Sequence, residues 1–568
     1  MIINYVKIEN YRNFDNFEIN LSKLSIIIGE NNSGKSNFLN ALKLILSGND
    51  LEYRQKRLSP SDFNSNSVKA YYSLLKDESS QQNLISKIPI IKVTIRFDEI
   101  QSEYEKAIVG NWINEIEGKV CYEIQYIFKP KSESDFLDYT KKQLTKSDEI
   151  IEDFSLNLPT EFYEYSIIST NNGKQIGYNE LKNISLNAIN AERDDFSESN
   201  TMRSNSILTK LLEKELNEEE KVNINNAYND FFKKIKEQEN FKKIFKSDVN
   251  FKNLDDFIKN INCIPNLANL KNILSNITLG YGDEFLFQKG LGQRNLIFIL
   301  LFFQHFKDNE SYFNLSCIEE PESHLSTNNL NFVIDYINKS VQKSKSLFQT
   351  IISSHNPNII NKLEFNNVIA FSGNKAISFK NVDQNLVQYL CKRPNFDILK
   401  LLFSNRIILV EGPTEEMFIN TLLMIRHEHL NNIDIISIGQ KGYRTFLEIW
   451  SKINIDNENK KIGIIRDFDN QPKAKEDHDF YDNDKTIYVR TTENYTLEDD
   501  LVSTGQNCKT IAEYFTIAND TKTVSDYLKD SKTDSMLELC NAISNRIVDK
   551  RIKLEIPKHI NEVLEKLK

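Results

Sequence analysis

The sequence is poor in the residues that mark secreted, disulfide-bonded or zinc-binding proteins. Its six cysteines are scattered over 568 residues without C-x-x-C spacing, which argues against both a disulfide framework and a zinc site. The N-terminus has no basic segment followed by an apolar run, so it is not typical of a signal peptide. These absences favour a protein of the reducing cytoplasm.

Long apolar runs and an excess of positive charge are also absent. The strongest apolar run, Leu296 to Phe303, is far shorter than the roughly 20 residues that cross a bilayer, and it predicts a buried helix and no membrane partner. The formal net charge of −10 by itself disfavours nucleic acid as a partner. A nuclease can still have this balance, because clustered carboxylates hold metal and only one face needs Lys and Arg. Charge therefore neither supports nor excludes DNA binding.

The chain is long enough for two or three domains, and its first part alternates strands and helices. The first forty residues predict a β-hairpin, a buried strand over Leu24 to Ile28, a loop over Gly29 to Ser36 and a helix over Asn37 to Leu46. Further strands are expected over Ile90 to Phe97 and Val120 to Phe128.

The pattern changes between about Ser206 and Phe245. Leucine and phenylalanine recur there at helical spacing among many Lys and Glu, without Gly or Pro. This predicts a helical hairpin or short coiled coil inserted into the first domain. Such a segment would either join two copies of the chain or stabilise a single one.

Residues Gly29 to Ser36 (GENNSGKS) fit the G-x-x-x-x-G-K-[ST] phosphate loop. They also lie where this loop is required, after a buried strand and before a helix. Backbone N–H groups of such a loop attract phosphate oxygens, Lys35 is expected to reach the β- and γ-phosphates, and the Ser36 hydroxyl is expected to ligate Mg²⁺. The residues predicted to bind ATP here are Gly29, Asn32, Ser33, Gly34, Lys35, Ser36 and Asn37.

Two later strands are expected to complete the ATP site. Asn314 to Ile318 predicts a short buried strand, after which Glu319 is assigned to the Mg²⁺ shell and Glu320 to the attacking water. Two Glu at a strand end are also typical of a solvated surface. Gln349 to Ser353 predicts another strand, and His355 after it either touches the γ-phosphate or has a structural role.

Together, the phosphate loop, the I-E-E-P-E-x-H-L segment and the S-S-H-N-P segment resemble the ABC-type heads of the RecF/SMC-like ATPases. The resemblance implies that Arg12 lies near the nucleotide base and that Asp62 serves as a Q-loop residue. It also implies that Lys289 to Ile297 (KGLGQRNLI) is the signature segment that closes on the ATP of a partner head. No Ser precedes its glycines, and a Gly-rich turn before a core helix is the alternative. Glu319 stands where the family has Asp, which implies slow turnover.

Carboxylates also follow two predicted buried strands in the last third of the chain, over Arg406 to Val410 and Ile462 to Ile465. The first strand precedes E-G-P-T-E, whose Pro suits the first position of a helix, and the second precedes D-F-D, whose acids share a face. Acids that converge at parallel strand ends repel unless a hard divalent cation neutralises them, and such a site suits two-metal phosphodiester cleavage. Ordinary solvated strand tips are the alternative. The acids predicted to bind metal and act in catalysis are Glu411, Glu415, Asp467, Asp469 and, from a third acidic segment, Glu498.

These motifs resemble the TOPRIM domain of topoisomerases, primases and related nucleases. An ATPase head followed by TOPRIM is similar in domain order to the OLD (overcoming lysogenisation defect) family of nucleases. The resemblance implies the roles of Glu415 as the family's second Glu and of Glu498, in its L-E-x-D-L context, as a further acid. It also implies that Lys532 neutralises charge at the scissile phosphate, with an ordinary surface lysine as the alternative. Gly439 to Gly442 is a plausible turn beside this site.

We therefore predict an α/β protein with an ABC-type ATPase head and a helical insertion, followed by a Rossmann-like TOPRIM domain with a helical C-terminal part. The expected boundaries are 1–200 and 263–395 for the two halves of the head, 201–262 for the helical dimerisation segment and 396–568 for TOPRIM.

The predicted function is an ATP-binding DNA endonuclease that depends on Mg²⁺ or Mn²⁺ and acts in bacterial antiphage defence. We expect a homodimer or homotetramer, with a helicase-like or other defence subunit as a candidate partner. One alternative is a RecF/SMC-like DNA-binding or repair ATPase whose TOPRIM domain does not cleave. A transporter ATPase would give the last third no role, and a topoisomerase would use Tyr443 or Tyr495 as its nucleophile.

Overall fold

A computed structural model describes most of the chain. The chain divides into two compact units. The N-terminal unit comprises Met1–Ile28 and Gly34–Leu363, and the C-terminal unit comprises Gly29–Ser33 and Glu364–Lys568. The ranges described are 1–46, 57–77, 80–100, 102–116, 118–146, 158–181, 183–189, 207–239, 270–275, 277–307, 313–343, 348–363, 365–381, 398–426, 433–439, 442–454, 457–544 and 552–568. No helix within these ranges combines the length and the apolarity that a membrane span requires.

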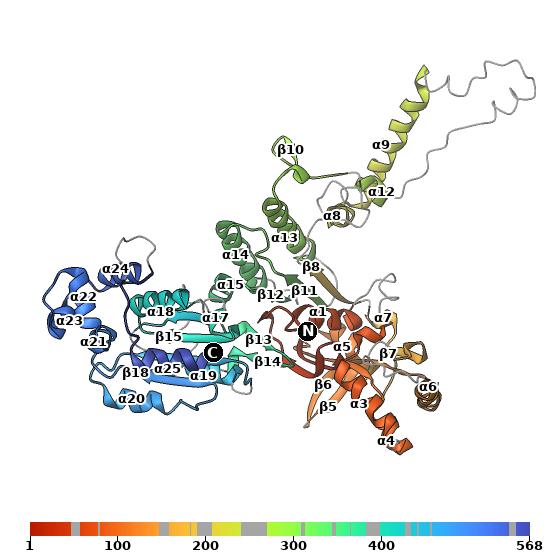
Figure 1. The fold of residues 1–568 in the computed structure, drawn as a ribbon. Helices are drawn as coiled ribbons and strands as arrows, with labels where there is room; N and C mark the ends of the chain where they lie inside the picture. Colours follow the sequence, from red (N-terminus) through yellow and green to blue (C-terminus); the bar gives the residue numbers. More distant parts are fainter. Residues whose placement is uncertain are drawn as a thin grey trace, which may run out of the picture. The chain divides into compact units, whose positions relative to one another are not determined.

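The N-terminal unit begins with an antiparallel sheet of order β2-β1-β4-β6-β5, with β7 paired to β6. Its strands are β1 (Ile2–Tyr11), β2 (Phe14–Asn20), β4 (Ile91–Asp98), β5 (Ile113–Ile116), β6 (Lys119–Pro130) and β7 (Tyr163–Ser169). Five helices accompany it: α3 (Ser65–Lys76), α4 (Gln81–Ser86), α5 (Glu103–Val109), α6 (Glu133–Lys146) and α7 (Tyr178–Leu181). The predicted β-hairpin is present as β1 and β2, and the two further strands predicted in this region are β4, shifted by one residue, and β6, which is longer than expected (Figure 1).

A parallel sheet carries the ATP motifs in the order β3-β12-β11-β8. Its strands are β3 (Leu24–Gly29), β8 (Ile184–Ile189), β11 (Phe313–Glu319) and β12 (Phe348–Ser353), and the chain continues from them into α1 (Lys35–Leu46), α14 (Thr327–Lys343) and α15 (Pro357–Lys362). Strands β3 and β11 are almost fully buried, as expected for a parallel sheet covered on both faces. Because the strands are parallel, the phosphate loop, Glu319 and His355 follow strand ends at one edge.

Gln349 connects these two sheets from inside the core. Its side chain is fully buried on β12, accepts a hydrogen bond from Ile3 N at 2.9 Å, and donates to Ile3 O at 2.8 Å and Ser22 O at 3.0 Å. A buried amide is stable only when its donors and acceptors are satisfied, so these bonds fix strand β1 against the end of β12.

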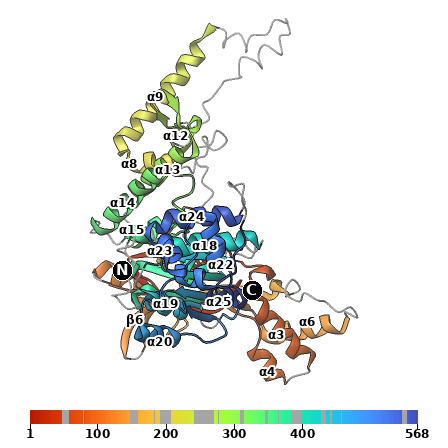
Figure 2. The same cartoon turned by 60° about the vertical axis from the view of Figure 1, so that its left-hand side comes forward.

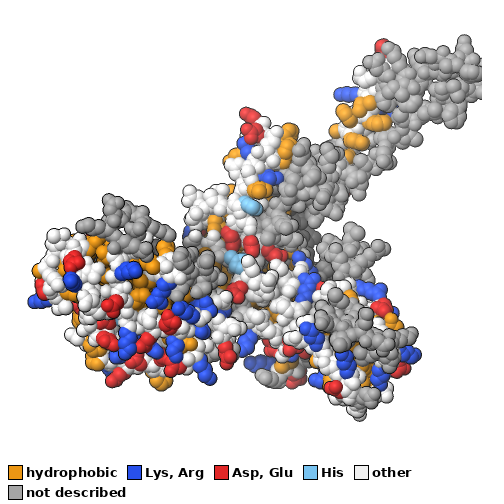
Figure 3. Space-filling view, in the orientation of Figure 1, with side chains coloured by type: hydrophobic (Ala, Val, Ile, Leu, Met, Phe, Trp, Pro, Cys, Tyr) orange, Lys and Arg blue, Asp and Glu red, His pale blue; other side chains and the backbone are white. Residues whose placement is uncertain are grey.

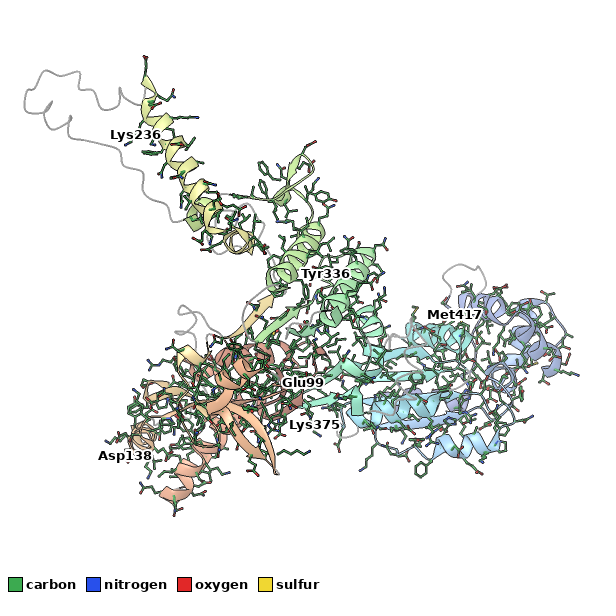
Figure 4. All side chains as sticks on the ribbon, turned by 180° about the vertical axis from the view of Figure 1, so that it is seen from behind. Glu99, Asp138, Lys236, Tyr336, Lys375 and Met417 are labelled. Carbon is green, nitrogen blue, oxygen red and sulfur yellow. The ribbon has the colours of Figure 1, made fainter. Side chains whose placement is uncertain are left out.

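The helical segment comprises α8 (Ile207–Glu215), α9 (Glu218–Glu237) and α12 (Leu270–Leu274). Helix α9 begins at a capping box in which Asn217 and Glu220 exchange hydrogen bonds with each other's backbone N–H. None of its residues is buried, and its side chains stand away from the helix up to Lys236 (Figure 4). The predicted helical pattern is present, but residues 201–206 and 240–262 of the proposed insertion lie outside the described residues.

The signature region precedes the second half of the head. A short hairpin of β9 (Gly280–Tyr281) and β10 (Glu284–Phe285) leads to α13 (Leu291–Lys307). The predicted buried run lies inside α13, but it is only partly buried there, with Ile299, Phe302 and Phe303 as its buried apolar residues.

The C-terminal unit is built on a parallel sheet of order β16-β15-β17-β18. Its elements in chain order are β13 (Val368–Ser372), β14 (Lys375–Ser378), α17 (Ile398–Phe403), β15 (Arg406–Val410), α18 (Pro413–Ile425), β16 (Ile433–Ser437), α19 (Tyr443–Asn454), β17 (Lys461–Arg466), α20 (Pro472–Asp479), β18 (Ile487–Thr491), α21 (Leu497–Ser503), α22 (Asn507–Phe515), α23 (Thr521–Asp530), α24 (Lys532–Ser544) and α25 (Lys558–Leu567). Strands β16 and β18 were not predicted. Each lies at an edge of the sheet, so β15 and β17 are direct neighbours although they are not consecutive.

One apolar core joins this sheet to α18 and to helices α21–α25. Helix α18 lies beside α24 in both ribbon views (Figures 1 and 2). Gly463 on β17 allows helix α25 to pack closely against the sheet, because a Cβ there would lie 2.4 Å from Val563 Cγ1 of that helix. The C-terminal helices are thereby held against the strands whose ends carry the acids.

Candidate functional site

The phosphate loop has the backbone conformation that its glycine requires. Gly34 has φ +98°, and a Cβ there would lie 2.4 Å from Asn13 Nδ2 and 2.7 Å from Phe14 Cζ, so only glycine fits. Asn32 also has a positive φ, of 66°, and Ser33 N donates to Glu30 O at 3.2 Å. The Ser33 hydroxyl is buried without a hydrogen-bonding partner among the described residues.

The two halves of the predicted ATP site meet at Ser36. Its hydroxyl donates to Glu319 Oε2 at 3.0 Å, across 283 positions of sequence. Lys35 is buried in the first turn of α1. The structure therefore places the three groups assigned to Mg²⁺ and phosphate at one strand edge.

Glu320 and His355 lie beside each other at the same edge. Glu320 Oε1 is 3.8 Å from His355 Nε2, and Glu320 N donates to Ser353 O at 2.8 Å, with φ 45° at Glu320. Burial, together with the nearby charge of Lys35, lowers the pKa of His355, while Glu320 opposes this change. His355 is therefore neutral at pH 7 and can donate one hydrogen bond to a phosphate, through the ring nitrogen that carries the proton.

Glu322 is a residue of this site that the sequence reasoning did not assign. Its Oε1 accepts hydrogen bonds from Ser354 Oγ at 2.7 Å and from His355 N at 2.8 Å. Its Oε2 is buried without a partner among the described residues, and burial raises the pKa of this carboxyl group. Glu322 therefore fixes the segment that carries His355. The E-P-E spacing was the available signal, but the contact itself is not local.

Arg12 is held by the residues that the resemblance grouped with it. Its Nε donates to Asp62 Oδ1 at 2.9 Å and its Nη1 donates to Asn37 Oδ1 at 2.9 Å. Asn37 in turn donates to Asn13 Oδ1 at 2.7 Å. Arg12, Asp62 and Asn37 thus form one network beside the phosphate loop. The roles of Arg12 near the nucleotide base, of Asp62 as a Q-loop residue and of Asn37 in ATP binding remain proposals.

The predicted signature segment approaches the Glu320 turn closely. A Cβ at Gly292 would lie 2.5 Å from His324 O, and Asn295 Nδ2 donates to Ser323 O at 2.9 Å. A glycine at position 292 is therefore required for the N-terminal end of α13 to contact this turn.

In the C-terminal unit, Glu411 and Glu415 lie at the end of β15 and in the first turn of α18. Pro413 is the first residue of that helix, as predicted. Glu415 is 3% exposed, and its Oε2 accepts from Gly412 N at 2.9 Å and from Thr414 Oγ1 at 3.1 Å. Its Oε1 is then the oxygen left for other partners.

Asp467 follows the neighbouring strand β17 and contacts Glu411 directly. Asp467 N donates to Glu411 Oε1 at 3.2 Å, and Asp467 Oδ1 accepts from Leu497 N at 2.9 Å. Asp469 has φ 51° and its N–H donates to Tyr495 O at 3.1 Å. The D-x-D segment is thus joined on one side to β15 and on the other to the start of α21.

The three consecutive acids of α21 have three different environments. Glu498 is fully buried, and its carboxylate has Lys532 Nζ at 3.5 Å as its nearest cation. Asp499 Oδ1 binds Lys529 Nζ at 2.6 Å. Asp500 accepts from Glu493 N and Asn494 N at 2.8 and 2.7 Å. Glu498 is therefore the member of this segment that joins the other carboxylates.

Lys532, the first residue of α24, lies between two of the acids. Its Nζ is 3.5 Å from Glu498 Oε1 and 4.0 Å from Glu415 Oε1. Burial lowers its pKa, but Glu498, Glu415 and Asp467 outweigh this effect, so the pKa of Lys532 is raised overall. The structure thus places this lysine in contact with the predicted carboxylate cluster.

The raised pKa values of two acids reflect how closely the carboxylates are crowded. Burial, and then the charges of Glu415, Glu411 and Glu498, raises the pKa of Asp467 to about 8. Burial also raises the pKa of Glu411 to about 7, with Asp469 and Glu415 adding to the effect and the Asp467 N–H opposing it. Five carboxylates beside two cations, Lys532 and Arg466, leave a net negative environment that favours a bound cation.

The donor set fits a hard divalent ion. All candidate ligands are carboxylate oxygens, and both oxygens of the fully buried Glu498 lack a hydrogen bond among the described residues. Within the described part of the chain, no three Asp, Glu, His or Cys side chains lie close enough together to hold a metal ion as they stand. Metal binding would therefore require side chains such as Glu411, Glu415 and Asp467 to reorient.

Two further residues are hydrogen-bonded to the backbone of β17 and of the D-F-D segment that follows it. Tyr443 is 2% exposed and donates to Ile465 O at 2.9 Å, and burial raises its pKa well above the ordinary value, which makes it unsuited to nucleophilic attack. Thr492 Oγ1 accepts from Phe468 N at 2.9 Å. Lys441, in the predicted turn, lies outside the described residues.

Two family matches correspond to the two motif groups. Residues 1–360 match the AAA ATPase domain family, and residues 402–469 match the TOPRIM domain of proteins like the overcoming lysogenization defect protein. The predicted order of an ATPase head followed by an OLD-like TOPRIM domain is confirmed.

Individual relatives agree with this order at low identity. The chain is 24% identical over 471 residues to "Endonuclease GajA" of Bacillus cereus (strain HuB5-5), covering 70% of this chain and 64% of the relative. It is 30% identical over 122 residues to "Endonuclease GajA" of Bacillus cereus (strain VD045), covering 19% of this chain and 20% of the relative. The chain thus spans less than two thirds of the length of either relative.

Among solved structures, the chain is similar to the "SmcHead bound to the C-winged helix domain of ScpA". That likeness covers 67% of this chain and 100% of the other, at 14% identity and a TM-score of 0.34. A score this low supports no argument, so the interpretation depends on the family matches and on the contacts described above.

Proposed function

Because this chain belongs to the AAA ATPase domain family and carries an OLD-like TOPRIM match in its C-terminal unit, we propose that it is an ATP-binding, divalent-metal-dependent DNA endonuclease. The observation that carries the proposal is the gathering of Glu415, Asp467 and Glu498 around Lys532 at one edge of a parallel sheet, with Glu411 bonded to the backbone of Asp467.

The nuclease chemistry follows from charge. Mg²⁺ or Mn²⁺ bound by Glu411, Glu415, Asp467, Asp469 and Glu498 would activate water and stabilise the leaving oxygen of a phosphodiester. Lys532 would leave its carboxylate contacts and pair with the scissile phosphate, where developing negative charge strengthens the interaction. Since Glu498 is fully buried, its charge without a cation would be costly, and this favours a metal ion that stays bound beside it when Lys532 moves away.

ATP would bind at the other site, cradled by Gly29, Asn32, Ser33 and Gly34, with Lys35 on the phosphates. The unpartnered Ser33 hydroxyl and the Ser36–Glu319 contact support this assignment. Glu320 and His355 are proposed to orient the attacking water and contact the γ-phosphate, and Arg12 and Asn37 to lie toward the base. Slow hydrolysis is expected with Glu319 in place of Asp, so ATP would act mainly as a conformational signal.

The assembly is proposed on more general grounds. We retain four parts, at 1–200, 201–262, 263–395 and 396–568, with dimerisation through the helical insertion. The absence of buried residues on α9 supports that role. A dimer or tetramer in antiphage defence, with a helicase-like or other defence subunit, is the corresponding biological proposal.

DNA binding would depend on local rather than global charge. On the visible face of the C-terminal unit, Lys and Arg side chains lie among Asp and Glu, without a field of one sign (Figure 3). A small number of phosphate contacts predicts a shallow dependence of affinity on salt concentration.

The test is cleavage of supercoiled DNA by the purified full chain with Mg²⁺, Mn²⁺ or EDTA, each with and without ATP. We expect metal-dependent nicked or linear product from the wild type and none from Asp469→Asn. Asp484→Asn serves as the matched control, since Asp484 is 73% exposed and pairs only weakly with Lys566 at 3.4 Å. Metal-dependent DNA binding without any product would replace this proposal by the non-cleaving repair ATPase.

A further inference from the structure

The loop between β18 and α21 is fixed beside the carboxylate cluster. Thr492 Oγ1 accepts from Phe468 N and donates to Asn494 O, both at 2.9 Å. Asp500 accepts from the N–H groups of Glu493 and Asn494, and Tyr495 O accepts from Asp469 N at 3.1 Å. The backbone of Tyr495 is therefore hydrogen-bonded directly to Asp469, one of the proposed metal ligands.

The side chain of Tyr495 is directed differently from its immobilised backbone. Its exposed fraction is 48%, in contrast to Tyr443, which is buried behind the same carboxylates. Lys529 Nζ lies 5.8 Å from the centroid of the Tyr495 ring, and Lys529 is itself fixed by Asp499 at 2.6 Å. A large aromatic ring thus stands partly in solvent, on a rigid loop, with a cation at its face.

These features match a surface that stacks nucleic-acid bases. Every base has a π-face, and a protein ring that stacks on it contributes about 1–3 kcal/mol per base without reading its identity. Bases inside a matched duplex already stack on each other, so a protein ring reaches only a base that is unpaired or displaced. A lysine beside the ring adds positive charge for the phosphate of the stacked nucleotide. The backbone bond between Asp469 and Tyr495 keeps this nucleotide near the proposed metal site.

We propose that Tyr495 is a base-stacking residue that positions an unpaired nucleotide next to the scissile phosphate. The substrate class is accordingly DNA that is single-stranded or opened at the cut. The position of this nucleotide next to a scissile phosphate rests on the proposed nuclease function, whereas the stacking contact itself can be measured without cleavage. A nucleophilic role for the Tyr495 hydroxyl would require a covalent phosphotyrosine, and it is an outcome of the test.

The binding test uses the full chain with Ca²⁺ and an oligonucleotide that carries 2-aminopurine either unpaired or in a matched duplex. We expect the wild type and Tyr495→Phe to quench the unpaired fluorophore. Tyr495→Ala should not quench it and should bind this DNA about 5- to 150-fold more weakly, the loss that corresponds to one stacked base. Matched duplex should show no quenching with any variant.

Phe480→Ala is the matched control, because Phe480 is 85% exposed but belongs to the end of α20 and contacts Tyr481. It should quench and bind like the wild type. Unfolding midpoints of all variants should agree within a few degrees, since an exposed side chain contributes little to stability.

The cleavage test repeats the comparison with Mg²⁺ or Mn²⁺. Tyr495→Phe should cut like the wild type, and Tyr495→Ala should lose its rate on opened DNA by a factor similar to its loss in binding. Equal quenching and cutting by wild type and Tyr495→Ala would overturn the inference, and so would a denaturation-resistant protein–DNA adduct that Tyr495→Phe cannot form. Tyr495-dependent quenching in a protein that cuts no DNA would support stacking while contradicting the nuclease function.

Discussion

Removing one charge from the carboxylate cluster should stabilise the metal-free protein while abolishing its activity. Asp467 is 5% exposed, and burial and neighbouring acids raise its pKa to about 8, while Glu411 is raised to about 7. In the unfolded chain both groups ionise near pH 4. Between about pH 4 and pH 8 the native state binds more protons than the unfolded state, so the free energy of unfolding falls as pH rises.

The size of the effect follows from the protons retained. At pH 6 the native protein keeps nearly two protons on Glu411 and Asp467, and at pH 8 about half of one. At about 1.4 kcal/mol per proton and pH unit, the metal-free protein loses about 4 kcal/mol of unfolding free energy between pH 6 and pH 8. For a domain of this size that is roughly 8–16 °C in melting temperature.

Asp467→Asn should abolish most of this loss, because the amide keeps an oxygen for Leu497 N but carries no charge. The assay is calorimetry of the full chain in EDTA at pH 6 and pH 8, with Asp484→Asn as the control and added Mg²⁺ restoring the wild type at pH 8. If the wild type melts at the same temperature at both pH values, and Asp467→Asn melts below it, the crowding argument is wrong.

Three other changes probe separate parts of the account. Lys532→Ala removes the cation beside the fully buried Glu498, so plasmid cleavage should fall by about 10²-fold or more, whereas Lys532→Arg should retain part of it. Glu319→Gln keeps an acceptor for the Ser36 hydroxyl but loses the charge, so phosphate release from ATP should fall at least about tenfold. An unchanged rate would remove Glu319 from the Mg²⁺ shell. Gly34→Ala should abolish binding of a fluorescent ATP analogue, because its φ of +98° and the 2.4 Å approach of Asn13 leave no room for a Cβ; normal binding would contradict the loop geometry.

The parts of the fold that were predictable depend on local signals. The phosphate loop, the helix start at Pro413 and the buried strands β11, β15 and β17 are each encoded by residues within one element. Strand β16 was missed because it is a short edge strand of mixed burial, and it carries neither a continuous apolar run nor a clear alternation.

The parts of the site that were not predictable depend on distant contacts. Three consecutive acids in α21 look equivalent in the sequence, yet Lys532, Lys529 and the 493–494 backbone select different ones. Glu322 became recognisable only when His355, 33 positions later, was seen to donate to it. Spacing indicates that an acid lies near a strand end, but long-range packing decides which acid joins the site.

The central claim is that the C-terminal acids share divalent ions, and binding of Mn²⁺ in the absence of nucleotide tests it most directly. Electron paramagnetic resonance of the full chain should show tight Mn²⁺ sites in the wild type and in Ser36→Ala, and their loss in Glu411→Gln and Asp467→Asn. Equal Mn²⁺ binding by the wild type and both acid variants would contradict the claim.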